Sequence, residues 1–375
     1  MIDVLIAGAG PAGTIAAILL ARAGVRVLVV DRARFPRAKL CGDTLNPGAV
    51  ACLQRLGLEG STNGALPLDG MVVTAERSAP IEGRYENARG YAISRSRFDD
   101  ALLRAAVRAG AGLEQQVLVD APLVDSGADV AVRGATVKGR TGNTMRLHAR
   151  LVIAADGRYS RLARALRLSR SPQRPRRWAI GAYFQDVGGM TTLGEMHIRP
   201  GHYIGVAPLP GGITNACVVT PHPGRGAPAD ILVSMIRRDP LLRDRFSRAR
   251  MIGLPSCLGP LAVDCAMPGM RGLLIAGDAA GFVDPMTGDG LRFAIRGAEL
   301  AAIEALHVLE HGNTDAHVRL LDARRREFTG KWRFNRTMRW VVEDSRALRL
   351  AELGAGVAPS VVQHVIRYAG DLHAA

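Results

Sequence analysis

A chain of 375 residues, 48% of them hydrophobic, is long enough for a two-lobed α/β enzyme with a large buried interior. It holds no uninterrupted apolar run of the roughly 18 residues that a spanning helix needs, so we predict no transmembrane segment. The net charge of +15 comes almost entirely from arginines that are spread along the chain. Because they form no basic block, we expect no nucleic-acid partner.

The first elements form one compact unit. Residues 3–7 predict an apolar strand, residues 11–23 a helix, and residues 25–30 a second, β-branched strand that ends in Asp31. No basic region with a cleavage site precedes the first strand, so we expect a cytoplasmic protein.

A glycine-rich loop joins the first strand to the helix. Gly8-Ala9-Gly10-Pro11-Ala12-Gly13 has the GxGxxG pattern, whose small residues let a pyrophosphate approach backbone amides at the positive helix end. Asp31 follows Gly13 by 18 residues, in position to accept hydrogen bonds from a ribose diol. This unit predicts an ADP-containing cofactor, but it does not separate NAD from FAD.

The following segments return to the same sheet and then build another. A helix is expected over residues 97–109, a small meander of strands over 117–145, and a buried strand over 151–155 that ends at Asp156-Gly157. Several strands between residues 178 and 221 predict a separate antiparallel layer. A buried strand at 273–276, a helix at 291–310, a basic helical region at 315–339 and a helical tail complete the chain.

Two further motifs decide between the cofactors. They are Ala155-Asp156-Gly157-Arg158, and Gly277-Asp278-Ala279-Ala280-Gly281 followed by Pro285-Met286-Thr287-Gly288-Asp289-Gly290. With the glycine loop, they resemble the three fingerprints of the class A flavin monooxygenases and the related geranylgeranyl reductases and flavin-dependent halogenases, over about residues 1–310.

The resemblance implies an α/β fold. It has a Rossmann-like FAD-binding domain of the glutathione-reductase type, similar to para-hydroxybenzoate hydroxylase, with an interleaved antiparallel substrate sheet and C-terminal helices. We assign residues 1–75, 90–175 and 260–310 to the FAD-binding domain, 76–89 and 176–259 to the substrate layer, and 311–375 to the helical region.

The resemblance also implies the residues that contact FAD. Asp278 would bind the ribityl chain, Gly288 and Gly290 would place amides at the pyrimidine edge, and Arg95 would lie near the ribityl or pyrophosphate. Cys41, in a segment resembling K-x-C-G, would pass beside the isoalloxazine as a packed thiol. The full set is Gly8, Gly10, Pro11, Ala12, Gly13, Asp31, Arg32, Lys39, Cys41, Gly42, Arg95, Asp156, Gly157, Gly277, Asp278, Pro285, Gly288, Asp289, Gly290 and Leu291.

No metal cluster or Ser-His-Asp relay is recognisable, and the five cysteines show no CxxC pair. The hard chemistry would then belong to the flavin. If a side chain acts as acid or base, the residues to test are His197, His202 and Tyr203 in the substrate layer.

Two branches of the resemblance remain open. The W-x-W-x-I-P segment of the halogenases is missing, and Gly205 and Ala207 stand where the geranylgeranyl reductases have aromatics. We therefore favour a monooxygenase that hydroxylates an apolar or aromatic molecule with molecular oxygen through a flavin C4a-hydroperoxide. The alternative is a reductase of C=C bonds in an isoprenoid or other lipid.

The partners follow from the same reasoning. With a single dinucleotide fingerprint, NADH or NADPH would bind transiently as reductant. The basic helix near Arg324-Arg325-Arg326 is a candidate for peripheral contact with anionic lipid. A noncatalytic basic nucleotide-binding protein is the hypothesis from another class.

Overall fold

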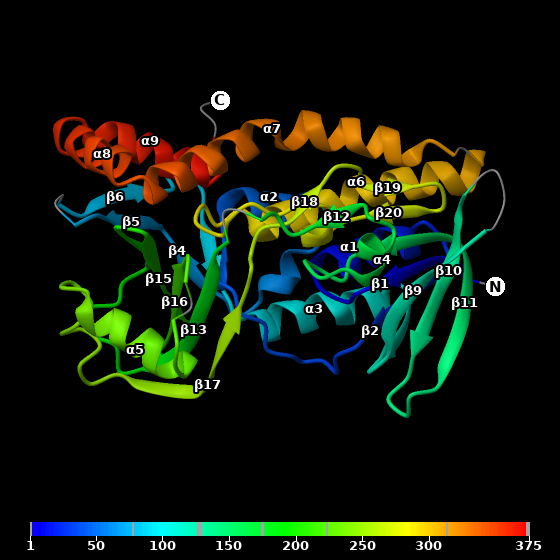
Figure 1. The fold of residues 1–375 in the computed structure, drawn as a ribbon, viewed down its shortest axis with the longest axis horizontal. Coiled ribbons are helices and arrows are strands. Elements are labelled where there is room, and N and C mark those ends of the chain that lie inside the picture. The colour runs from blue at the N-terminus through cyan, green and yellow to red at the C-terminus, as the bar shows by residue number, and fades with distance from the viewer. Residues whose placement is uncertain are drawn as a thin grey trace.

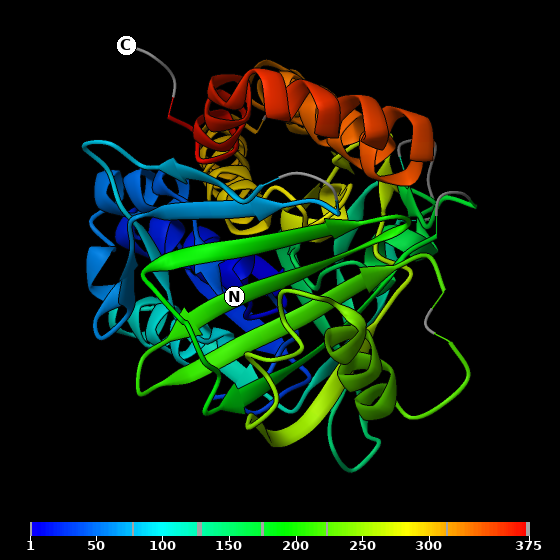
Figure 2. The same cartoon turned by 90° about the vertical axis from the view of Figure 1, so that its left-hand side faces the viewer.

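The computed structural model describes residues 2–76, 79–125, 130–173, 176–222, 224–312 and 314–372. Two sheets lie side by side, and a long helical arm runs across one edge of both (Figures 1 and 2). The prediction of a mixed α/β fold with a parallel sheet and a separate, mainly antiparallel sheet is confirmed.

The first sheet carries the strand order β19-β20-β11-β1-β2-β8, and all pairs except β19–β20 are parallel. The central strands β1, β2 and the second half of β11 are near-continuous apolar runs, as expected for parallel strands that are covered on both faces. The bounds are β1 Ile2–Ala7, β2 Val27–Asp31, β8 Gly112–Gln115, β11 Thr144–Ala154, β19 Gly269–Met270 and β20 Leu273–Ile275. Helices α1 (Pro11–Arg22), α3 (Arg95–Arg108) and α6 (Gly290–His311) bury their apolar faces in one cluster with this sheet.

The predicted meander exists, but its last strand differs from the prediction. β9 (Leu118–Val124) and β10 (Val132–Lys138) pair antiparallel, and β10 pairs with the first half of β11. β11 then continues without a break into the parallel sheet beside β1. One strand thus belongs to both layers. The sequence predicted two strands, because polar and apolar residues alternate in the exposed half of β11 whereas its buried half is uniformly apolar.

The second sheet has the order β17-β13-β16-β15-β14-β5-β6. Its strands are β5 Gly70–Thr74, β6 Ile81–Arg84, β13 Trp178–Gln185, β14 Leu193–Arg199, β15 His202–Leu209, β16 Ile213–Thr220 and β17 Arg250–Leu258. β5 pairs parallel with β14, so residues 70–74, which the sequence placed with the first domain, are part of this sheet. The domain division as a whole stays a prediction.

The second sheet has two different faces. Alternate residues such as Ile180, Ile204 and Val218 point to one face, where helix α5 (Pro228–Arg238) covers them. We call this the outer face. Residues such as Ala179, Tyr203 and Val219 point to the inner face, toward the first sheet and its loops.

The shorter elements connect the two sheets. They are β3 Thr44–Leu45, α2 Pro47–Arg55, the 3-10 turn η1 Glu59–Thr62, β4 Leu66–Leu68, β7 Gly90–Ala92, α4 Arg161–Ala165, β12 Ser169–Arg170, β18 Asp264–Cys265 and the 3-10 turn η2 Gly277–Ala280.

The C-terminal arm consists of α7 (Ala316–Glu343), α8 (Ser345–Val357) and α9 (Pro359–Ala369). α7 packs along α6, and α9 returns against β6 (Figure 1). Arg324 is buried and donates to the Ala280 carbonyl at 2.9 Å. Of the three arginines predicted to contact lipid, only Arg325 and Arg326 are therefore exposed.

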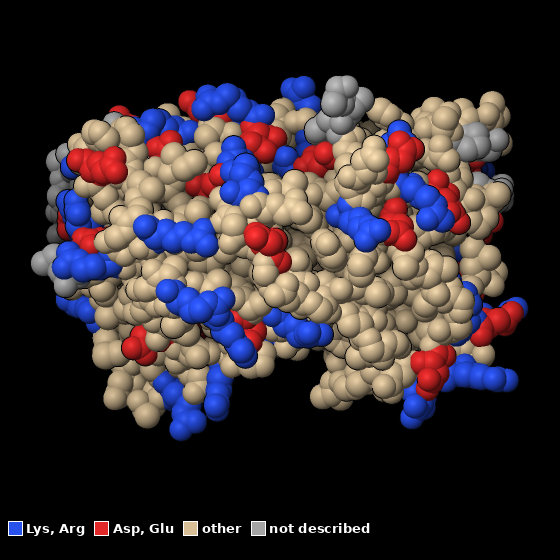
Figure 3. All heavy atoms as spheres, turned by 180° about the vertical axis from the view of Figure 1, so that it is seen from behind, with Lys and Arg blue, Asp and Glu red and all other residues tan. Residues whose placement is uncertain are grey.

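The surface matches the even spread of arginines in the sequence. On the face shown in Figure 3, basic and acidic side chains are interspersed, without one large block of either sign. None of the helices in the described ranges is both long and apolar enough to cross a membrane.

Candidate active site

The glycine loop after β1 is folded as close backbone approach requires. A Cβ on Gly13 would lie 1.8 Å from the Gly8 carbonyl oxygen, and a Cβ on Gly8, at φ +98°, would lie 2.5 Å from the Ala155 oxygen. Only glycine fits at either position. The loop therefore brings the start of α1 directly against the strand ends.

The N-terminus of α1 is open to a ligand. Its N-cap is Gly10, no side chain caps the first turn, and that turn holds no acidic residue. The free backbone N–H groups and the positive end of the helix dipole favour an anion there. Beside it, the two carboxylate oxygens of Asp31 accept from the amides of Ala9 and Ala33, each at 2.7 Å, and keep further lone pairs for hydroxyl donors.

Asp156-Gly157 forms the second side of this loop. Asp156 accepts from the Arg161 amide at 3.0 Å, while its other carboxylate oxygen is buried without a hydrogen-bond partner among the described residues. Burial raises the pKa of Asp156. An unsatisfied buried oxygen at this position is the kind of group that a bound ligand or water completes.

A continuous groove runs from Asp31 to the second sheet. One part has about 1370 Å³ of partly open space and is lined by Gly8, Asp31, Arg32, Arg37 and Asp156, among others. The other part, about 1030 Å³, reaches Gly288 and the second sheet. Both are lined by Gly10, Lys39, Leu40, Ala155, Gly157, Arg158 and Leu258, which makes them one elongated site.

Four cations line the middle of the groove: Arg37, Lys39, Arg95 and Arg158. Buried Asp99 accepts from Arg95 at 2.7 and 2.9 Å and lies 3.2 Å from Arg37. Lys39 lies 4.0 Å from Asp278, and burial followed by the nearby Arg95 lowers its pKa to about 8. The carboxylates of Asp99 and Asp278 lie among these cations and do not balance them, which leaves an excess positive charge suited to a pyrophosphate.

The K-x-C-G segment is tied to the second sheet by Asp43, which the sequence analysis did not identify. Asp43 is fully buried, accepts from Tyr183 at 2.7 Å and from Asn215 at 2.6 Å, and has a left-handed φ of +56°. Burial raises its pKa to about 6. Tyr183 and Asn215 are cross-strand neighbours on β13 and β16, a pairing that sequence spacing does not reveal.

Cys41 lines the groove as a thiol. Burial raises its pKa, which disfavours the thiolate that a nucleophile needs. The Cys217 thiol lines the same part of the groove from β16, and burial raises its pKa to about 12. The interpretation of Cys41 as a packed thiol fits this environment.

The Gly288-Asp289-Gly290 loop closes the far end of the groove. Gly288, with φ +70°, Gly290 and Leu291 line it, while Asp289 points away and is buried. Asp289 accepts from Asn46 at 3.0 Å and lies 3.4 Å from Lys331 of α7. The helical arm therefore supports the loop from behind, a contact that the sequence analysis missed.

The wall nearest the second sheet is mostly apolar. It is made by Ala179 and Cys217 of the inner face, Leu258 at the end of β17, and Leu261 and Phe282 of the connecting loops. All but two of the cofactor residues predicted from the sequence line this one groove. The exceptions are Gly13 and Asp289, which support the groove from behind its surface.

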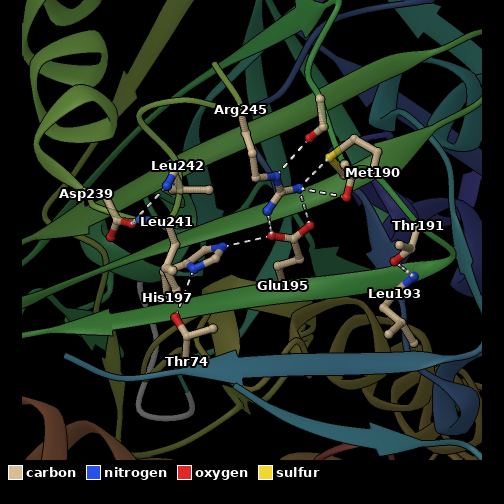
Figure 4. A network of polar contacts seen from close by, with 12 residues as sticks. Thr74, Met190, Thr191, Leu193, Glu195, His197, Asp239, Leu241, Leu242 and Arg245 are labelled. Carbon is tan, nitrogen blue, oxygen red and sulfur yellow. Dashed lines mark hydrogen bonds and ion pairs between the residues drawn. The ribbon is translucent and has the colours of Figure 1, made fainter. Parts of the chain in front are cut away.

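The three predicted acid–base candidates do not meet in this groove. His197 is buried on the outer face, where its ring nitrogens contact Thr74 and Glu195, each at 2.9 Å (Figure 4). His202 contacts the Pro200 carbonyl at 3.2 Å. Tyr203 points inward but donates to buried Asp284 at 2.6 Å, and burial raises its pKa well above the usual value.

Residues of the groove fit FAD. The uncapped helix end and the glycine contacts provide for a dinucleotide pyrophosphate, the unsatisfied Asp156 oxygen can accept from a hydroxyl group or a water, and the groove extends well beyond the helix end. Among the described residues, no group of three or more His, Cys, Asp or Glu side chains could hold a metal ion.

Comparisons with known proteins agree with this geometry. A family model described as FAD binding domain matches residues 1–207. The chain is 32% identical to the menaquinone reductase of Mycolicibacterium smegmatis, over 80% of this chain and 75% of the relative. It is 31% identical to digeranylgeranylglycerophospholipid reductase 1 of Methanopyrus kandleri, over 84% and 83%.

A solved structure shares the fold over the full length. It is a geranylgeranyl bacteriochlorophyll reductase-like protein from Thermoplasma acidophilum, with a TM-score of 0.81, 21% identity and 99% of each chain covered.

Proposed function

This chain belongs to the FAD binding domain family and is an FAD-dependent oxidoreductase, and from that premise we propose that it reduces carbon–carbon double bonds in the isoprenoid part of a lipid or quinone. One observation carries the proposal: the groove ends at an apolar wall on the inner face of the second sheet. An isoprenoid chain has no hydrogen-bonding groups and needs such a wall. The names of the two relatives described above support this choice.

FAD, when bound and reduced, supplies a hydride that an acceptor carbon receives. The chain's own residues hold and orient it: the α1 N-terminus and the cations Arg37, Lys39 and Arg95 suit the phosphates, and Asp31 suits the adenosine ribose. NADH or NADPH is the proposed transient reductant. Leu258, Leu261 and Phe282 exclude water from the wall.

Reduction of a C=C bond also requires a proton. The thiols of Cys41 and Cys217 keep their protons at neutral pH because burial raises both pKa values. Lys39 also lines the groove, and burial lowers its pKa to about 8, so its Nζ releases a proton more readily than an ordinary lysine.

A monooxygenase remains the second candidate. The small inner-face residues Gly205 and Ala207 favour it, because they leave room for a bulkier or aromatic substrate. The same flavin site would serve either reaction, so the fold alone does not distinguish a reductase from a monooxygenase.

The test is the reoxidation of the reduced holoprotein in rapid mixing. Under anaerobic conditions, a geranylgeranyl lipid that carries no quinone ring should reoxidise the protein and gain two hydrogens by mass. The fully saturated analogue of the same lipid is the control and should leave the protein reduced. Fast reoxidation by dissolved oxygen, with an oxygen atom added to an aromatic acceptor, would instead establish the monooxygenase.

A further inference from the structure

Helix α8 carries a row of exposed apolar side chains. Leu350, Leu353 and Val357 are 70%, 69% and 89% exposed, and their spacing of three and four residues places them on one face of the helix. We call these three residues the apolar stripe. The opposite face of α8 holds it to the protein, since Leu348 is buried and Glu352 accepts from the Glu76 amide at 3.0 Å.

The stripe lies at the outside of the molecule. α8 and α9 form the outer end of the helical arm, on the side of β6 (Figures 1 and 2). Trp340, 58% exposed, lies in the last turn of α7, which ends at Glu343 just before α8. An exposed apolar helix face and an exposed tryptophan in the preceding helix turn are typical of a surface that meets another apolar phase.

Positive charge accompanies the stripe. Arg346 lies four residues before Leu350 and shares its face, Arg349 borders it, and Arg333 and Arg336 lie on the exposed side of α7. Within the part of the chain that the structure describes, these four guanidinium groups form no ion pair. The acidic Asp344 instead caps α8 by accepting from two of its backbone amides, each at 2.9 Å.

The same arm touches the wall of the groove from the other side. Val342 is buried two residues after Trp340 and packs in one cluster with Tyr203 and Leu261, and Leu261 lines the groove. One turn of α7 therefore has an outward tryptophan and an inward valine next to the proposed substrate wall. A surface that docks here would lie close to the apolar end of the site.

We propose that the apolar stripe, Trp340 and the surrounding arginines dock the protein on an anionic lipid surface, with α8 lying in the plane of the interface. Apolar burial supplies part of the attraction, and arginines near anionic headgroups supply the rest. A second copy of this chain is the competing occupant, and the exposed arginines without ion pairs favour anionic headgroups over it. The proposal rests on the proposed function only for its purpose, delivery of a lipid substrate.

The test is cosedimentation of the FAD-loaded protein with vesicles that contain no isoprenoid. Vesicles of phosphatidylcholine with phosphatidylglycerol should bind the protein, pure phosphatidylcholine should bind it much less, and added salt should weaken the binding. Leu353→Gln should lower the partition coefficient about tenfold, in line with the transfer free energy of a leucine side chain. Arg346→Gln should lower it about fivefold.

The matched control is Leu254→Gln, which changes a 93% exposed leucine on β17, outside the arm. It should leave vesicle binding unchanged, and flavin absorbance should show that all variants keep the fold. Equal binding to both vesicle types, or an equal effect of Leu254→Gln and Leu353→Gln, would overturn the proposal. Dissociation of a dimer by Leu353→Gln in sedimentation equilibrium would also overturn it and would assign the stripe to a second copy.

These outcomes are independent of the proposed reaction, because the vesicles carry no substrate. A protein that binds the anionic vesicles but fails to reduce an isoprenoid would contradict the proposed function alone. A protein that reduces a detergent-dispersed isoprenoid but ignores the vesicles would contradict the docking surface alone.

Discussion

The two faces of the second sheet hold polar residues of very different kinds. The outer face has a dense buried network in which Glu195 contacts His197 at 2.9 Å and accepts from Nη1 and Nη2 of Arg245, each at 2.7 Å (Figure 4). The inner face has few polar groups, and there Tyr183 and Asn215 hold Asp43 beside the groove. His197 thus lies outside the groove, and the described residues that line the groove include no histidine.

This difference shows that a buried titratable side chain is a candidate catalytic residue only when it also lines a cavity that a ligand can enter. Burial alone would raise the pKa of Glu195, but Arg245 and His197 hold it below its usual value. All three side chains satisfy one another and join β14 to the segment after α5. We therefore interpret the outer network as structural, and four predictions test this contrast.

The largest effect is expected from Gly13→Val at the flavin end of the groove. The new side chain would overlap the Gly8 carbonyl, since even a Cβ would lie 1.8 Å from it. We expect no FAD-loaded protein on purification, measured as the ratio of flavin to protein absorbance. Gly354→Ala in α8, where a Cβ meets nothing within 4 Å, is the control and should purify yellow. A yellow Gly13→Val protein would refute the assignment of this loop.

Glu195→Ala should destabilise the protein without changing its flavin. It leaves Arg245 and His197 without their shared partner, and breaking such a buried pair costs about 3–5 kcal/mol. Urea denaturation measures the loss, and Glu195→Gln, which keeps the shape and part of the hydrogen bonding, should lose less. Loss of FAD or of turnover in the protein that remains folded would show that the outer face takes part in the reaction.

Asp43→Asn should change how stability depends on pH. Because burial raises the pKa of Asp43 from 3.8 to about 6, the folded state binds a proton that the unfolded state releases between these values. The stability contributed by this group is full below pH about 4 and is lost as the pH rises through about 6, by up to about 3 kcal/mol. Denaturation in constant excess FAD should show this decline in the wild type and a flatter curve in the variant. Parallel curves would contradict the assigned environment.

His197→Gln should have the smallest effect. It replaces a buried ring that makes two hydrogen bonds, at a cost of about 1–2 kcal/mol. The pH profile of kcat should stay that of the wild type, because the ring does not reach the groove. A lost limb in that profile would restore His197 as an acid or base.

Much of the FAD-binding half could be predicted from the sequence. The glycine loop, the two aspartate-glycine turns and their order along the chain lie at strand ends that local patterns mark, and the predicted superfamily resemblance is confirmed. Close approach of two backbone segments requires glycine, so the glycines at positions 8 and 13 allow this loop to be identified from the sequence.

The other features of the site depend on strand register and on contacts between residues far apart in the sequence, and no local sequence pattern indicates these. Asp43 meets Tyr183 and Asn215 from 140 and 172 positions away. Lys331 of α7 lies 3.4 Å from Asp289, but the sequence of this helix indicates only that it is basic and not which residue it contacts. The face on which His197 lies follows from its pairing with Ile204, and a shift of one residue would have reversed it.

The central claim is that the flavin ring and the substrate meet at the inner face of the second sheet. A crystal structure of the holoprotein with FAD and a lipid acceptor, grown without oxygen, tests it most directly. We predict the adenosine beside Asp31, the ring between the Gly288–Gly290 loop and Cys217, and the isoprenoid against Leu258 and Leu261. A ring or lipid bound at the outer face, near His197 and Glu195, would contradict the account.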